Sequence, residues 1–81
     1  MTPAQCRGAR ALLDITQPQL AERAELGLST IVDYERERRK ISPEAVRSIR
    51  SALERAGAEF IDENGGGPGV RLRKRQRGKT P

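Results

Sequence analysis

Residues 16–36 of the chain read TQPQLAERAELGLSTIVDYER. Residues 17–24 and residues 28–36 each place small and apolar side chains at helical spacing, and Glu25-Leu26-Gly27 interrupts the pattern between them. This predicts two short helices that pack against each other across a three-residue turn. The predicted inward positions carry apolar, small or aromatic side chains; they are Leu20, Ala21, Ala24, Leu26, Ile31 and Tyr34.

Capping signals predict where the other helices begin. Thr2 and Thr16 are each followed three residues later by a glutamine, the arrangement of a capping box, with a proline in the first turn. Ser42 with Pro43 predicts the start of a fourth helix, which Gly57 would end. We expect the first helix to bury Cys6, Ala9 and Leu13, with Leu12 beside them, and the fourth to bury Val46, Ile49, Leu53 and Ala56.

The pattern changes after residue 57. Residues 59–61 and 70–73 have the character of short strands, and the glycine-rich run 64–69 lies between them. Residues 75–81 carry no apolar side chain to bury. The predicted fold is therefore mainly α: a four-helix domain over residues 1–57, a C-terminal β-hairpin over residues 58–73 and a disordered basic tail over residues 74–81.

The positive charge is unevenly distributed along the chain. The net charge is +5 over 81 residues, but six of the sixteen lysines and arginines lie in residues 70–81, without an acid among them. Residues 1–69 therefore hold ten basic against eleven acidic side chains, with a local basic cluster at residues 36–40. Such clusters indicate a nucleic-acid partner, and the alternative for the tail is a solubilising segment.

Several classes of protein are disfavoured by the composition. One cysteine, Cys6, excludes an internal disulfide and a cysteine-rich metal site, and there is no histidine. The glycine-rich run 64–69 lacks the Lys-Ser/Thr ending of a phosphate-binding loop. No apolar run approaches the roughly 20 residues that a membrane span needs, and no signal peptide is evident. We expect a cytoplasmic protein with no enzymatic activity, no cofactor and no metal.

The residues of the central stretch resemble a known family. The pattern Gln17-x-x-Leu20-Ala21-x-x-Ala24-x-Leu26-x-x-Ser29-Thr30-Ile31-x-x-x-Glu35 is similar to that of the Cro-like, phage-repressor-like helix-turn-helix regulators, the XRE family, and the likeness covers residues 3–57. The resemblance implies a domain whose third helix enters the major groove of DNA. Two positions depart from the family: Glu25 stands where a glycine is usual, and Gly27 where a serine or threonine cap is frequent.

The resemblance also implies which side chains meet DNA. The exposed face of the third helix would contact bases, while Gln17 and the loop that follows the third helix would contact phosphates. Asp33 could accept a hydrogen bond from a cytosine amino group or orient an arginine such as Arg36. The expected DNA contacts are Gln17, Leu28, Ser29, Thr30, Val32, Asp33, Arg36, Arg38, Arg39 and Lys40.

Two further expectations concern packing and assembly. The family pairs an arginine of the first helix with a glutamate at the end of the third, which Arg10 and Glu35 match. The four-helix unit offers the hairpin little spare surface, so we expect the hairpin to form a dimer through Phe60, Ile61, Val70 and Leu72. The competing arrangement folds the hairpin back on the fourth helix.

The function expected from these features is regulation of transcription. A bacterial homodimer would bind an operator in double-stranded DNA on the nucleoid and repress its own or nearby promoters. One alternative is an antitoxin or small adaptor whose main partner is another protein. Another is a binder of nucleic acid without sequence preference, acting through the tail.

Overall fold

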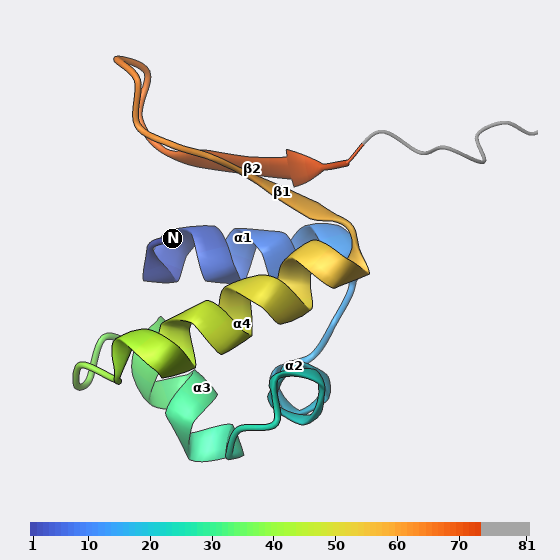
Figure 1. Cartoon of the computed structure of the whole chain (residues 1–81), viewed down its shortest axis with the longest axis vertical. Helices are drawn as coiled ribbons and strands as arrows, with labels where there is room; N and C mark the ends of the chain where they lie inside the picture. Colours follow the sequence, from blue (N-terminus) through green and yellow to red (C-terminus); the bar gives the residue numbers. More distant parts are fainter. Residues whose placement is uncertain (74–81) are drawn as a thin grey trace, which may run out of the picture.

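The computed structural model describes residues 1–73. Its elements are α1 (Pro3–Leu13), α2 (Gln17–Ala24), α3 (Leu28–Glu35), α4 (Pro43–Ala56), β1 (Ala58–Ile61) and β2 (Gly69–Leu72), shown in Figure 1. The mainly helical fold with a C-terminal hairpin is confirmed, and α3 ends one residue earlier than expected, with Arg36 as its C-cap. The predicted tail, residues 74–81, lies outside the described residues.

The predicted capping boxes are present at α1 and α2. The backbone amide of Gln5 donates to Oγ1 of Thr2 at 3.1 Å, and Oε1 of Gln5 accepts from the amide of Thr2 at 2.8 Å. Thr16 and Gln19 repeat this exchange at α2. Each box satisfies two backbone amides that have no partner inside the helix, so local sequence alone determines these starts.

The α3 helix begins without such help. Its N-cap is Gly27, which makes no side-chain hydrogen bond, so the amides of the first turn lack the partner that a serine or threonine would supply. At the other end of the turn Glu25 caps α2 in the left-handed conformation, at φ 59°. The amide of Leu26 then donates to the carbonyl of Ala21 at 2.9 Å, which closes the turn. Tertiary packing must therefore hold α3 in place.

Small and aliphatic side chains from all four helices and β1 form the core. Tyr34 is its one aromatic member, and α2 contributes two alanines that allow close approach to α3 and α4. Leu12, expected beside the inward face of α1, is 46% exposed. The buried apolar residues are Cys6, Ala9, Ile15, Leu20, Ala21, Ala24, Ile31, Tyr34, Ile49, Ala52, Leu53 and Ala58.

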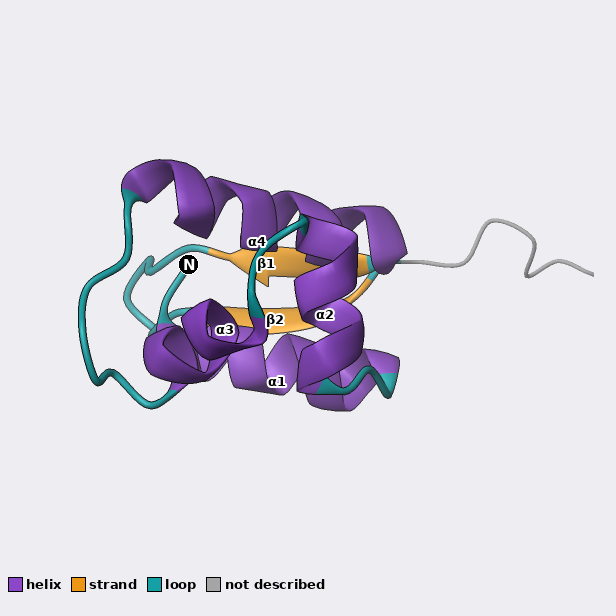
Figure 2. Ribbon diagram, turned by 90° about the horizontal axis from the view of Figure 1, so that it is seen from below, coloured by secondary structure: helices purple, strands orange, loops and turns teal. Residues whose placement is uncertain are grey.

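The hairpin lies across α1 and α4. Figures 1 and 2 show β2 running beside α1 and β1 beside α4, while the turn of the hairpin projects beyond the helices. The strands are antiparallel, with Ala58 opposite Leu72 and Phe60 opposite Val70. The amide nitrogen of the Gln5 side chain donates to the backbone carbonyls of Ile61 and Gly69, and so joins α1 to both strands.

The premise that the four helices offer the hairpin little spare surface is therefore wrong. Gly8 lacks a side chain at the point where α1 faces β2, and a Cβ there would lie only 3.2 Å from Cγ1 of Val70. Phe60 also packs against the core, with the Arg50 guanidinium 5.2 Å from its ring centre. The side chains of Phe60 and Val70 thus pack against the core of their own chain, whereas Leu72 is 43% exposed.

Two features are absent from the described residues. None of the helices in residues 1–73 combines the length and the apolar character that crossing a membrane requires. Over the same residues, His, Cys, Asp and Glu side chains do not gather in threes where a metal ion could be held.

Candidate nucleic-acid interface

The α3 helix divides its side chains between the core and the surface. Ile31, Tyr34 and Glu35 are buried against the other helices. Opposite them, Leu28, Ser29 and Arg36 are exposed, and Thr30, Val32 and Asp33 are half-buried. The predicted base-contacting residues therefore share one accessible side of a short helix, whose orientation the buried side fixes.

A buried carboxylate anchors the end of α3. Nε and Nη2 of Arg10 donate to the two oxygens of Glu35 at 2.7 and 2.8 Å. The Glu35 side chain is 1% exposed and that of Arg10 is 20% exposed. Burial alone would raise the pKa of Glu35, but hydrogen bonds from Arg10, Cys6 and Gln17 outweigh it and hold that pKa below its ordinary value. Glu35 is therefore an anion that three donors share.

Two of these donors extend the network beyond the expected pair. Nε2 of Gln17, at the start of α2, donates to Oε1 of Glu35 at 3.0 Å, and Sγ of Cys6 donates to Oε2 at 3.1 Å. Burial, followed by the hydrogen bond to Glu35 and the charge of that carboxylate, raises the pKa of the Cys6 thiol well above its ordinary value. Sequence reasoning treated Cys6 as a small apolar side chain, because a thiol is a weak donor that leaves no pattern.

Gln17, the first residue of α2, is thus held in place by Glu35. One N–H of its side-chain amide is used by Glu35, and the half-buried residue keeps part of its surface accessible. An amide nitrogen carries two donors. The contact with Glu35 therefore orients the Gln17 side chain and leaves its second N–H for another acceptor.

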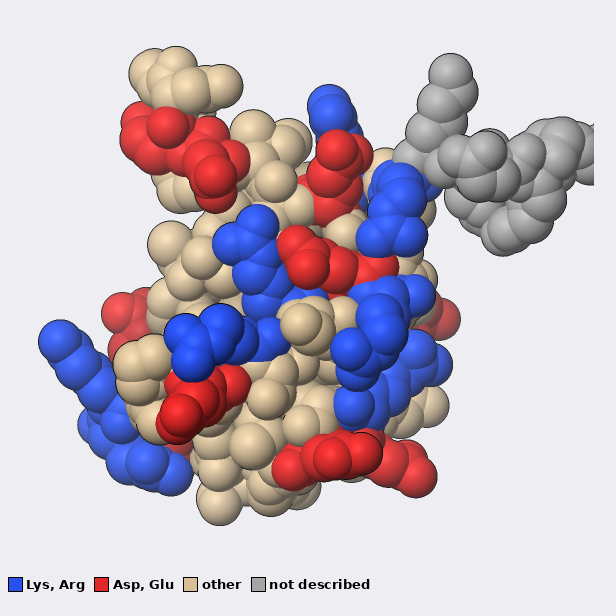
Figure 3. Space-filling model, in the orientation of Figure 1, with Lys and Arg blue, Asp and Glu red and all other residues tan. Residues whose placement is uncertain are grey.

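The loop between α3 and α4 carries the basic cluster. Arg38, Arg39 and Lys40 are all exposed. Glu37 takes the left-handed conformation at φ 56°, and the backbone amide of Arg38 returns to the carbonyl of Asp33 at 2.9 Å. In Figure 3, basic side chains project at the lower left, where this loop lies in Figure 1.

Asp33 has a different arginine partner from the one considered from the sequence. Nε of Arg39 donates to Oδ2 of Asp33 at 2.8 Å, whereas Arg36 makes no ion pair within residues 1–73. From the sequence, Arg39 is expected to contact phosphates alone. Arg36 follows Asp33 at a spacing that suggested a pair, but the turn of the chain at residue 37 brings Arg39 back along α3 instead.

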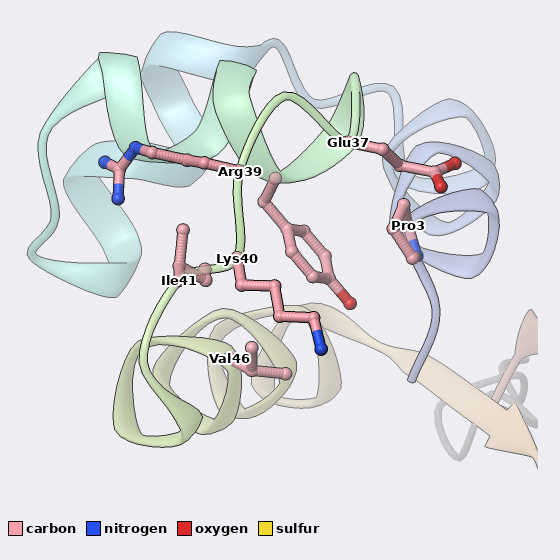
Figure 4. Close-up of a pocket in the computed structure, with 7 residues that line it drawn as sticks. Pro3, Glu37, Arg39, Lys40, Ile41 and Val46 are labelled. Carbon is pink, nitrogen blue, oxygen red and sulfur yellow. The ribbon is translucent and has the colours of Figure 1, made fainter.

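A hollow of about 410 Å³ lies beneath the same loop (Figure 4). Figure 4 shows the Arg39 side chain extending towards α3, while Lys40 extends in the opposite direction, towards Val46 on α4. The two cations are therefore presented on different sides of the loop. The hollow is lined by Pro3, Tyr34, Glu37, Arg39, Lys40, Ile41 and Val46.

Comparison with known families gives a match that covers this architecture. The model of the family described as Helix-turn-helix matches residues 7–60, from within α1 to within β1 and so over more than half of the chain. The chain belongs to the Cro-like (XRE) helix-turn-helix family. A comparison with curated protein sequences finds no match.

Membership of the helix-turn-helix family assigns the parts of the interface. It is a family of DNA-binding regulators. In a helix-turn-helix domain the second helix of the motif enters the major groove while the first crosses the backbone. Here α2 and α3 are the two helices of the motif, joined by the turn at residues 25–27.

Proposed function

We propose that the protein is a sequence-specific regulator of transcription that reads an operator with α3. The observation that carries the proposal is the division of α3 into a buried side, which anchors it to α1 and α2, and an accessible side of mixed polarity. Polar and apolar side chains together can distinguish base edges by hydrogen bonds and by contact with thymine methyl groups. Leu28, Ser29, Val32 and Arg36 are suited to this, with Thr30 at the margin.

Contacts with phosphates position the recognition helix. The second N–H of Gln17 lies at the N-terminus of α2, and Arg38 and Lys40 follow α3 on the exposed loop. Contacts of this kind fix the register of a protein on DNA without reading its sequence, and they make binding depend strongly on salt. This division assigns affinity to Gln17, Arg38 and Lys40 and the reading of bases to α3.

The proposal includes a homodimer that acts as a repressor on the bacterial nucleoid. Two α3 helices would occupy successive major grooves about 34 Å apart, which matches a palindromic operator. Since Phe60 and Val70 pack within the chain, Ile61 and Leu72 are the two of the four expected dimer contacts that remain for a partner. Exposed strand edges pair readily with a second copy. A dimer bound over a promoter would block transcription.

Selection of binding sites from random DNA tests the reading of bases by α3. The wild-type protein is expected to enrich a palindromic sequence. Ser29→Ala and Arg36→Ala should each weaken binding to it by about 1–3 kcal/mol and relax the preference at particular base pairs. Arg47→Ala, an exposed arginine of α4, is the matched control. Unchanged selection profiles in both α3 variants would remove α3 as the reader.

Sedimentation tests the dimer. We expect the full chain to be dimeric at micromolar concentration and Leu72→Asp to be monomeric, because a buried carboxylate without a partner is costly at an interface. Leu28→Asp is the control, since Leu28 is 46% exposed and lies on α3, away from the hairpin. A Leu72→Asp protein that remains dimeric would exclude the hairpin as the interface.

A further inference from the structure

Asp33 is the one acidic residue on the accessible side of α3. Its neighbours on this side carry no negative charge; they are Leu28, Ser29, Val32 and Arg36. DNA presents a dense row of phosphates, so a free carboxylate on this side would oppose binding at every sequence. Asp33 therefore needs either a neutralising partner or a role in reading bases.

Arg39 supplies the neutralising charge. The ion pair is 2.8 Å long, with 21% of the Asp33 side chain and 54% of the Arg39 side chain exposed. Exposed pairs of this kind contribute little to folding. The loop nevertheless turns back through the left-handed Glu37 to make it, and Arg39 extends towards α3 (Figure 4). The ion pair therefore acts mainly by neutralising and orienting the Asp33 carboxylate.

The ion pair uses one oxygen of the Asp33 carboxylate and leaves the other for another donor. Oδ2 is bound by Arg39, and within residues 1–73 no side chain donates to Oδ1. A carboxylate whose second oxygen is fixed presents a single oriented acceptor. Such an acceptor discriminates sharply, because it is attracted by donors and repelled by other acceptors.

The edges of the bases determine which one fits a lone acceptor. In the major groove guanine offers two acceptors and thymine an acceptor and a methyl group, so both repel a carboxylate. Adenine offers an amino donor, but the acceptors N7 of adenine and O4 of thymine lie on either side of it. The amino group of cytosine has an acceptor on one side only, which makes cytosine the best match.

We propose that the Asp33–Arg39 pair determines specificity, with Oδ1 of Asp33 accepting a hydrogen bond from the 4-amino group of a cytosine in each operator half-site. The proposal rests on the proposed function, because α3 must enter the major groove for Asp33 to meet a base. Arg39 is the positioning residue: it neutralises the carboxylate near the phosphates and fixes the oxygen that is presented.

Selection of sites by Asp33 variants tests the assignment. The wild-type protein should enrich a cytosine at one position of each half-site, and Asp33→Ala should lose that preference by about tenfold or more while keeping the other positions. Asp33→Asn should shift the position towards adenine, because an asparagine amide both donates and accepts and so pairs with N7 and the amino group of adenine. Circular dichroism of each variant checks that it is folded.

Variants of the loop separate positioning from general attraction to DNA. Arg39→Gln should weaken the cytosine preference as well as affinity, whereas Arg38→Gln, from the same exposed loop, should lower affinity alone. The assignment is overturned if Asp33→Ala keeps the cytosine preference, or if the wild-type protein selects a site without a preferred cytosine. Either result leaves the proposed function intact. Failure of the wild-type protein to enrich any sequence overturns both.

Discussion

At the residue scale, Glu35 joins three helices. Its carboxylate accepts from Arg10 and Cys6 of α1 and from Gln17 of α2, while the residue itself closes α3. Nη1 of Arg7 also donates to the backbone carbonyl of Glu35. No buried side-chain nitrogen or oxygen within residues 1–73 lacks a hydrogen-bond partner. A buried charge is tolerated only when it is satisfied in this way, so each donor to Glu35 matters for stability.

Arg10→Ala should destabilise the fold by about 3 kcal/mol, because it leaves the Glu35 carboxylate buried without its counter-charge. For a domain of this size the midpoint of thermal unfolding should fall by roughly 10 °C or more. Arg47→Ala removes an exposed arginine of α4 and should change stability by less than about 0.5 kcal/mol. Thermal melts of the two variants that coincide would show that the Arg10–Glu35 contact does not stabilise the domain.

The lowered pKa of Glu35 predicts an acid-labile fold. The ordinary pKa of the group is 4.5, and its pKa in the folded chain is lower. As the pH falls below that ordinary value, the unfolded chain takes up the proton first, so stability is lost until the pH has passed through the folded pKa. Urea unfolding at about pH 6 and about pH 3 should show a smaller loss for Glu35→Gln than for the wild type. Glu22→Gln, an exposed residue of α2, should keep the wild-type loss.

At the scale of elements, the turn between α2 and α3 is locally imperfect. Glu25 holds the left-handed conformation without being glycine, and Gly27 begins α3 without a side-chain cap. The first feature strains the backbone, and the second leaves the start of α3 without a side-chain cap. The motif forms because Leu26 and Ile31 pack on the core and Glu35 anchors the far end of α3.

Glu25→Gly should stabilise the domain by up to about 1 kcal/mol. Glycine adopts the left-handed conformation without the steric cost that a Cβ imposes, although the unfolded chain gains entropy. Glu22→Gly, three residues earlier inside α2, should instead destabilise by about 1 kcal/mol. Urea midpoints of the two variants give the comparison. A Glu25→Gly protein that is destabilised as much as Glu22→Gly would show that the turn is unstrained.

At the scale of the whole molecule, the hairpin packs on α1 and α4 and is also a candidate interface. Ala58 is fully buried, Phe60 and Val70 pack on the core, and Gln5 binds both strands. A two-stranded hairpin is marginal alone, so its stability derives from α1 and α4. The same contacts stabilise α1 and α4 in return.

A chain that ends at Gly57 should therefore be less stable than the full chain, by about 2 kcal/mol or more, because it exposes the apolar surface that the hairpin covers. Urea unfolding followed by circular dichroism measures the difference. Gly66→Ala, in the open turn of the hairpin, is the control and should unfold like the wild type. Equal midpoints for the truncated and full chains would contradict the packing of the hairpin on the helices.

Much of the fold could be predicted because its signals are local. The capping boxes at Thr2 and Thr16, the cap at Ser42 and the terminating Gly57 each act within a few residues of the helix end they define. The buried side of α3 also followed from helical spacing. The place of the hairpin did not, because the absence of a side chain at Gly8 has meaning only once Val70 is known to lie opposite it.

The sequence by itself determined four helices, a hairpin and the family to which they belong, since capping and periodicity are short-range properties. Only the tertiary structure decided which side chains meet. It joined Cys6 and Gln17 to Glu35, paired Asp33 with Arg39 instead of Arg36, and laid the hairpin on α1 and α4. The pairing of Asp33 depends on how the chain turns at residue 37, and the place of the hairpin depends on the space left at residue 8. The contacts of Glu35 join residues that are far apart in the sequence, and no local pattern encodes the distance between such residues.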